Sequence, residues 1–186
     1  LPDPPYPTLK ANNGANHRIK SDRGFRLGAK INNKLDGQPS PTASADPDDD
    51  GVTRYTGPIP EWRSGDTTTI FVSAANNLGR DGYLSAWADW TKDGFDATDQ
   101  IMFLDSNNNP VPDVVLQNGP NTLRFLAPRG LNTVDTFARF RYSDVAGLSF
   151  DGPPDGTLPQ DMPFGEVEDY AVHITGGDAT INGYVF

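Results

Sequence analysis

The sequence predicts an all-β fold: an antiparallel β-sandwich of the jelly-roll or Ig-like kind, with long ordered loops and little helix. Three observations predict it. Only 35% of the 186 residues are hydrophobic, while 19 Gly and 17 Pro supply many turn formers. Aromatic residues still make up 10% of the chain, more than a disordered acidic chain carries. Finally, seven or more short segments rich in β-branched and aromatic residues alternate with turn signals, as in sandwiches.

The elements follow in chain order. Residues 1–24 open on the proline-rich stretch LPDPPYPTL, which blocks helix and central strand alike, so we expect an ordered, irregular arm lying on the domain. Residues 32–51 form a polar loop ending in DPDDDG, and residues 96–104 have room for one or two helical turns. Strands are expected at 25–31, 67–75, 83–90, 113–117, 122–127, 136–143, 167–174 and 179–186, with turns such as NNNP and DGPPDG between them.

The chain is expected to form one domain over residues 1–175. Nothing inside that range has the composition of a linker. The segment TGGDAT, at 175–180, does. Residues 176–186 are therefore predicted to be a linker and strand that lead to a following module or pair with a neighbouring subunit.

Charge and cysteine content exclude several classes of site. The net charge of −10 makes nucleic acid and anionic membrane poor partners, and it favours cations. The absence of Cys excludes disulfides, thiolate metal sites and Cys nucleophiles. With only two His, zinc is also disfavoured. No apolar run approaches the roughly 18 residues of a membrane-spanning helix.

The segment WADWTKDGFDATDQ, at 87–100, resembles a calcium loop in its spacing. Asp89, Thr91 and Asp93 stand at loop positions 1, 3 and 5, and Gly94 stands at position 6, where a sharp turn is needed. Gln100, at position 12, lacks the bidentate carboxylate that usually closes such a loop. The loop therefore needs carboxylates from elsewhere in the chain.

Two acidic segments could supply them. Ca²⁺ takes about 6–8 oxygen ligands, so several segments must converge on one ion. We expect the GEVEDY acids to turn toward an ion that Asp89 and Asp93 help to hold. Solvated surface loops are the alternative interpretation for each acidic run by itself. The candidate ligands are Asp46, Asp48, Asp49 and Asp50 in DPDDDG, and Glu166, Glu168 and Asp169 in GEVEDY.

The order of these motifs resembles the GEVED domain family. PDPPYPTL, NGANHRI, the segment from RLGAKI to DPDDDGV, YLSAWADWTKDGF, TFARFRYS and GEVEDYAVHI follow the motif order of that family. The resemblance implies a module of secreted and surface-attached bacterial proteins. The final ATINGYVF resembles the first strand of the B-type repeats of serine-aspartate surface adhesins, which implies a place in a multidomain chain.

We therefore expect a non-catalytic, calcium-stabilised structural or adhesive module, extracellular, in a bacterial surface or secreted protein. Its expected partners are other surface modules or like subunits, with strand pairing as one means of assembly. Carbohydrate binding through Trp62 and Trp90 is the main alternative, with Trp62 expected to be exposed. A glycoside hydrolase-type carboxylate pair is the catalytic alternative. Arg139 and Arg141 are expected to pair with the GEVEDY acids.

Overall fold

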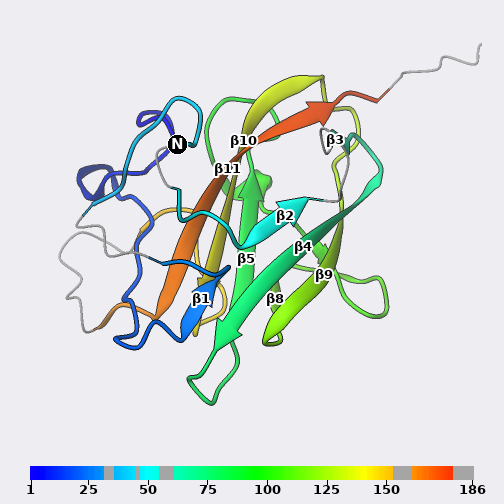
Figure 1. Ribbon diagram of the computed structural model, residues 1–186. Coiled ribbons are helices and arrows are strands. Elements are labelled where there is room, and N and C mark those ends of the chain that lie inside the picture. Colours follow the sequence, from blue (N-terminus) through cyan, green and yellow to red (C-terminus); the bar gives the residue numbers. More distant parts are fainter. Residues whose placement is uncertain (32–35, 45–46, 55–60, 153–160, 178–186) are drawn as a thin grey trace, which may run out of the picture.

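The computed structural model describes residues 1–31, 36–44, 47–54, 61–152 and 161–177. Two β-sheets pack face to face, and β4 crosses the front of the molecule with β10 and β11 behind it (Figure 1). The prediction of a β-sandwich is confirmed. The strands are β1 Phe25–Leu27, β2 Val52–Arg54, β3 Glu61–Arg63, β4 Thr67–Asn76, β5 Tyr83–Ala88, β6 Phe103–Leu104, β7 Pro110–Val111, β8 Asp113–Val115, β9 Gly119–Leu126, β10 Val134–Ser143 and β11 Gly165–Thr175.

The first sheet has the strand order β1-β4-β9-β6-β7, with β2 also pairing with β4. The second sheet has the order β3-β11-β10-β5-β8. Every strand pair is antiparallel except β11 with β3, which places Ile174 beside Trp62 in a parallel register. The second sheet is therefore mixed, which the sequence analysis did not predict.

Helix is confined to two short 3₁₀ turns in the described residues, η1 Lys10–Asn12 and η2 Ala97–Asp99. The second lies inside the window that the sequence marked for helical turns. The Asp96 carboxylate accepts the Thr98 N–H, and the Asp99 carboxylate accepts the Asp96 N–H, a reciprocal cap. Neither helical turn has the length and apolarity needed to cross a membrane, and no other helix occurs in the described ranges.

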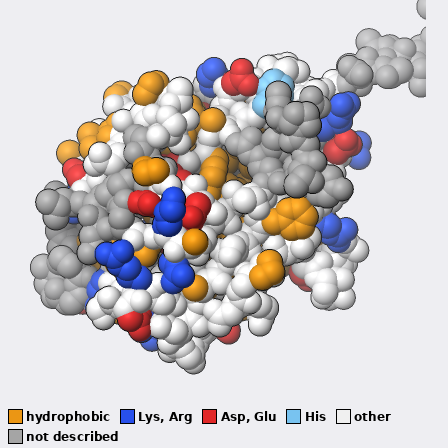
Figure 2. Space-filling view, in the orientation of Figure 1, with side chains coloured by type: hydrophobic (Ala, Val, Ile, Leu, Met, Phe, Trp, Pro, Cys, Tyr) orange, Lys and Arg blue, Asp and Glu red, His pale blue; other side chains and the backbone are white. Residues whose placement is uncertain are grey.

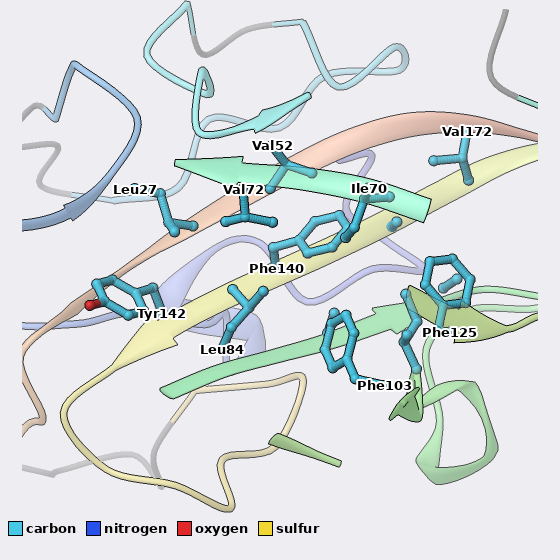
Figure 3. Close-up of a cluster of buried hydrophobic side chains, with 14 of the residues drawn as sticks. Leu27, Val52, Ile70, Val72, Leu84, Phe103, Phe125, Phe140, Tyr142 and Val172 are labelled. Carbon is cyan, nitrogen blue, oxygen red and sulfur yellow. The ribbon is translucent and has the colours of Figure 1, made fainter. Parts of the chain in front are cut away.

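The main core lies between the two sheets and follows the alternation of the strands. Ile70, Val72 and Ala74 of β4 point inward and are nearly inaccessible. Phe140 and Tyr142 of β10 meet them from the other sheet (Figure 3). Each such aliphatic or aromatic side chain contributes about 1.5–3 kcal/mol when it is fully buried.

A second, smaller core lies on the outer face of the second sheet, under the proline-rich arm. It contains Leu1, Tyr6, Trp87 and Phe95. Tyr6 makes edge-to-face contacts with Phe95 and with Phe137 of β10, with ring centroids 5.0 and 5.1 Å apart. The arm is thus ordered on the domain as predicted, and it makes both faces of β10 and β5 interior.

Candidate functional site

The GEVEDY segment forms the first half of β11, and two of its acids point between the sheets. Glu166 Oε2 accepts the backbone N–H of Leu27 in β1, at 2.7 Å. Glu168 Oε1 accepts the N–H groups of Asp50 and Gly51, at 3.0 and 2.8 Å. These partners precede the motif by more than 100 residues. The two glutamates therefore join β11 to the backbone at the edge of the opposite sheet.

Tyr170 extends the same row by one inward position. Its hydroxyl donates to Glu168 Oε2 at 3.0 Å and accepts the Val52 N–H at 3.1 Å. Its ring packs edge-to-face on Phe140, with centroids 5.8 Å apart. Alternation along the strand predicts that Glu166, Glu168 and Tyr170 share one face, and the structure confirms it. The hydrogen bonds of the Tyr170 hydroxyl to Glu168 and Val52 could not be predicted from the sequence.

Burial and crowding change the acidity of both glutamates. The pKa of Glu166 is raised to about 9, mainly by burial and then by the charge of Glu168, with smaller contributions from Asp49 and Asp50. Burial also raises the pKa of Glu168 to about 7, although the N–H groups of Gly51 and Asp50 and the Tyr170 hydroxyl stabilise its carboxylate. Both carboxyls would be stabilised by a proton or a cation.

Asp169 points the other way, toward the outer face of the sheet. Arg139 Nε and Nη2 donate to its two carboxylate oxygens at 2.8 and 2.9 Å, a bidentate pair. Arg139 Nη1 also donates to the carbonyls of Pro7 and Phe150, at 2.7 and 3.0 Å. With 1% of its surface exposed, Arg139 anchors both the proline-rich arm and the loop after β10.

Arg141, two residues along β10, bonds to neutral groups. It donates to the carbonyls of Ser149, Asp151 and Asn16, and its Nε lies 3.2 Å from His17 Nε2. Burial and the charge of the neighbouring arginine lower its pKa to about 9. Burial, and then the Arg141 charge, lower the pKa of His17, so its imidazole is neutral and its Nε2 accepts a hydrogen bond from Arg141 Nε. The predicted pairing with GEVEDY acids is confirmed for Arg139 and wrong for Arg141, because Arg141 lies opposite Val167.

The Asp89 carboxylate is buried and has protein donors on both oxygens. Asp93 N–H donates to Oδ1 at 3.1 Å, and Gly94 N–H and the Tyr6 hydroxyl donate to Oδ2 at 3.0 and 2.5 Å. Gly94 takes a φ of 103°, which favours Gly. The Thr91 hydroxyl donates to Asp93 at 2.6 Å. Asp89 thus closes its own turn and holds the arm.

The structure does not place the predicted calcium ligands around one point. Asp89 lies on the outer face, where its carboxylate accepts the Tyr6 hydroxyl, whereas Glu166 and Glu168 lie on the inner face of the same sheet. Asp50 Oδ1 accepts the N–H groups of residues 29 and 30, at 3.0 and 3.3 Å. Asp46 lies outside the described residues.

A cavity of about 190 Å³ lies beside GEVEDY, between the arm, the loop before β2 and the edge of β11. Asn16 Oδ1, in its wall, is buried and has no hydrogen-bond partner. Within the described ranges no three acidic or His side chains already converge on a metal position. The charged groups of the wall are Lys10, Asp36, Asp48, Asp49, Arg139, Glu166 and Asp169.

The predicted aromatic binding residues are core residues. Trp62 and Trp90 are 1% and 5% exposed, and their rings lie 5.9 Å apart. The prediction that Trp62 would be exposed is wrong, because its short strand pairs with β11 and directs the indole between the sheets. Trp87 is buried too, in the outer core. None of the three offers a face on which a sugar could stack.

Residues 83–173, from the start of β5 almost to the end of β11, match the family model of the GEVED domain. The chain contains a GEVED domain. The match covers β5 to most of β11, whereas the resemblance seen in the sequence extended over most of the chain. No curated protein and no solved structure matches the chain significantly. The GEVEDY segment bonds to segments that precede the matched range, namely β1 and residues 50–52, and the Leu1 amino group of the arm lies 3.8 Å from Asp169 Oδ2.

Proposed function

We propose that this GEVED domain is a non-catalytic structural or adhesive module of a secreted or surface-attached bacterial protein, stabilised by calcium. One observation carries the proposal: each acid of GEVEDY bonds inside the domain, to backbone N–H groups or to a buried arginine. Through these hydrogen bonds the carboxylates of GEVEDY hold together segments that are far apart in the sequence. A module that must hold its shape outside a cell without disulfides needs such ties.

The same arrangement argues against a glycoside hydrolase-type pair. Such a pair flanks a substrate cleft, with one carboxylate beside the scissile bond and the other opposite. Glu166 and Glu168 stand on one strand and face the backbone of the other sheet. Asp169 is neutralised by Arg139. We therefore propose that these carboxylates maintain the fold.

Calcium is proposed for the cavity beside GEVEDY. Its oxygen-rich wall suits a hard cation, and the unsatisfied Asn16 Oδ1 is a neutral ligand of the kind that Ca²⁺ accepts. Asp48, Asp49 and Glu166 are the carboxylates that would hold it. A cation there would favour the Glu166 carboxylate, whose pKa is raised mainly by burial and then by the charge of Glu168. It would stabilise the native state by mass action.

Thermal unfolding tests the calcium proposal. Chelation should lower the melting temperature, and Ca²⁺ in about 100-fold excess over its dissociation constant should restore about 2.7 kcal/mol, with Mg²⁺ much weaker. The double variant Asp48→Asn/Asp49→Asn should lose the calcium shift. The matched control is Asp66→Asn/Asp81→Asn, two exposed acids outside the cavity wall. An unchanged melting temperature on adding Ca²⁺ to the parent domain, or an equal shift in both variants, would rule calcium out of this site.

The proposed location is tested on the protein as its host cells produce it. Trypsin added to intact cells should remove a surface-attached module, and culture medium should contain a secreted one. Electron microscopy would show whether like subunits associate through strand pairing. Retention inside intact cells would contradict the proposed extracellular role.

A further inference from the structure

A basic patch interrupts the acidic surface of this chain. Residues 18–30 hold five basic residues and one acidic residue, a net charge of +4 in a chain whose net charge is −10. Arg23, Arg26 and Lys30 line one shallow hollow around β1, together with Ala29, Ile31 and Asp48. Blue side chains gather around the β1 end of the molecule in Figure 2. We call Arg23, Arg26 and Lys30 the basic patch.

The three cations of the basic patch bond to neutral groups. Arg23 donates to the Ile31 carbonyl, Arg26 to the Arg23 carbonyl and Lys30 to the Pro47 carbonyl, at 3.2, 2.6 and 3.4 Å. None of them is in an ion pair with a described carboxylate, whereas Lys20 close by is paired with Asp22. Each cation of the basic patch retains further donors for an anionic ligand.

The alternation of β1 explains why the patch faces outward. Phe25 and Leu27 are fully buried in the core, so Arg26 between them points to the outer face of the first sheet. Arg26 stands opposite Ala75 of β4, the last residue in the outward row of that strand. The patch is therefore continuous with the outer face of β4 and β9.

That outer face carries hydroxyls and few apolar groups. Thr53, Phe71 and Thr122 are neighbours across β2, β4 and β9, so an aromatic side chain lies between two hydroxyls. Thr69 stands opposite Arg124, and Thr67 stands opposite Leu126. A protein interface usually has a large apolar centre, whereas the apolar side chains of this face, Phe71 and Leu126, stand among threonines and an arginine. Hydroxyls, a ring and cations together suit a charged sugar polymer.

We propose that the basic patch and the adjoining face of β4 bind an acidic polysaccharide, a polymer of sugars carrying carboxylate or sulfate groups. The cations bind the anionic groups, and the threonine hydroxyls contact the sugar rings. The net negative charge of the domain is screened beyond about 8 Å at physiological salt, so the local patch decides binding. This inference rests on the adhesive part of the proposed function and names its partner.

The proposed binding of an acidic polysaccharide is tested by measuring binding to polygalacturonate, dextran sulfate and neutral dextran, each in 50 and in 300 mM salt. One or both acidic polymers should bind, more weakly at high salt, and neutral dextran should not. Arg23→Gln/Lys30→Gln should weaken binding at least about fivefold, because two exposed charge contacts are lost. The matched control, Lys92→Gln/Arg129→Gln, removes the same charge from exposed positions elsewhere. It should change binding less than about twofold.

A second variant probes the sheet face. Thr122→Glu places a negative charge, of the same sign as the polymer, on the exposed face of β9. It should also weaken binding and should leave the melting temperature unchanged. Binding that falls equally in the patch and control variants would mean non-specific attraction and would overturn the inference. So would failure to bind either acidic polymer, or self-association that Arg23→Gln/Lys30→Gln abolishes. None of these outcomes depends on the calcium shift, which tests the proposed function separately.

Discussion

Glu168 accepts the backbone N–H of Gly51, 117 residues earlier in the chain, at 2.8 Å. Its side chain is completely buried, and Asp50 N–H and the Tyr170 hydroxyl are its other donors. Four polar groups thus satisfy one another between the two sheets. Such a network stabilises a fold when it is complete and destabilises it when a member is lost.

Replacing Glu168 by Ala should be strongly destabilising. It leaves the N–H groups of Asp50 and Gly51 buried without an acceptor, at a cost of about 3 kcal/mol or more in the free energy of unfolding. Glu168→Gln retains one carbonyl oxygen for these donors and should cost less. Urea unfolding measures both. Equal losses for the two variants would indicate that charge matters here more than hydrogen-bond acceptance.

Arg139→Lys should detach the proline-rich arm. Lysine keeps the charge but cannot form the bidentate pair with Asp169 while bonding to Pro7 and Phe150, so about 2 kcal/mol of stability should be lost. Limited proteolysis should then cut within the first 24 residues. The exposed pair of Arg63 and Asp66, 3.9 Å apart, provides the control. Arg63→Lys should change stability by less than about 0.5 kcal/mol, and an arm that stays protected in Arg139→Lys would contradict the anchoring role.

Much of the fold could be predicted from the sequence because its long strands carry clear patterns. The expected strands at 67–75, 83–90 and 136–143 correspond to β4, β5 and β10 within two residues. Alternation along YLSAWADW also places Trp87 and Trp90 on opposite faces, and they lie in the outer and the main core respectively. The short strands β2, β3, β6 and β7 were not predicted. A strand of two or three residues is too short to show an alternation of apolar and polar residues. Only its hydrogen bonds to a neighbouring strand define it.

The site could be predicted only in part. Alternation put Glu166 and Glu168 on one face, but nothing local says that their partners are Leu27 and Gly51. Grouping them with Asp89 followed from residue type alone, and the sheet separates the two sets. Backbone N–H groups and cations both bind carboxylate oxygens, and sequence composition does not distinguish the two kinds of partner. The expected strand at 179–186 lies outside the described residues, and the calcium site stays a prediction.

Gly165, the first residue of the motif, should tolerate no side chain. A Cβ at this position would lie 2.2 Å from the Tyr142 carbonyl oxygen and 2.6 Å from His17 Nδ1, far inside van der Waals contact. Gly165→Ala should therefore shift β11 away from β10 and lower the melting temperature by several degrees. Gly177→Ala is the matched control, because the nearest atom there is 3.5 Å away. A melting temperature unaffected by Gly165→Ala would mean that this strand end can move.

The chelated domain should become less stable as pH rises from about 5 to about 9. Burial raises the pKa of Glu166 to about 9 and that of Glu168 to about 7, above their values in the unfolded chain. The folded state then holds more protons than the unfolded state in this range, so the free energy of unfolding falls as pH rises. Each proton contributes at most about 1.4 kcal/mol per pH unit.

Melting curves from pH 5 to 10 in the presence of chelator measure this slope. Between about pH 5 and 6.5 the two glutamates are opposed by His17, because burial lowers the pKa of His17 and protonation of its imidazole favours the unfolded state. The fall should therefore be clearest between about pH 7 and 9 and should level off above about 9. Glu166→Gln should flatten the profile between 7 and 9, since the remaining titration is that of Glu168. Calcium bound beside Glu166 would favour its carboxylate, so added Ca²⁺ should flatten the same range in the parent domain. A flat profile between about pH 7 and 9 in chelator would show that Glu166 is already ionised in the fold, and it would contradict this prediction.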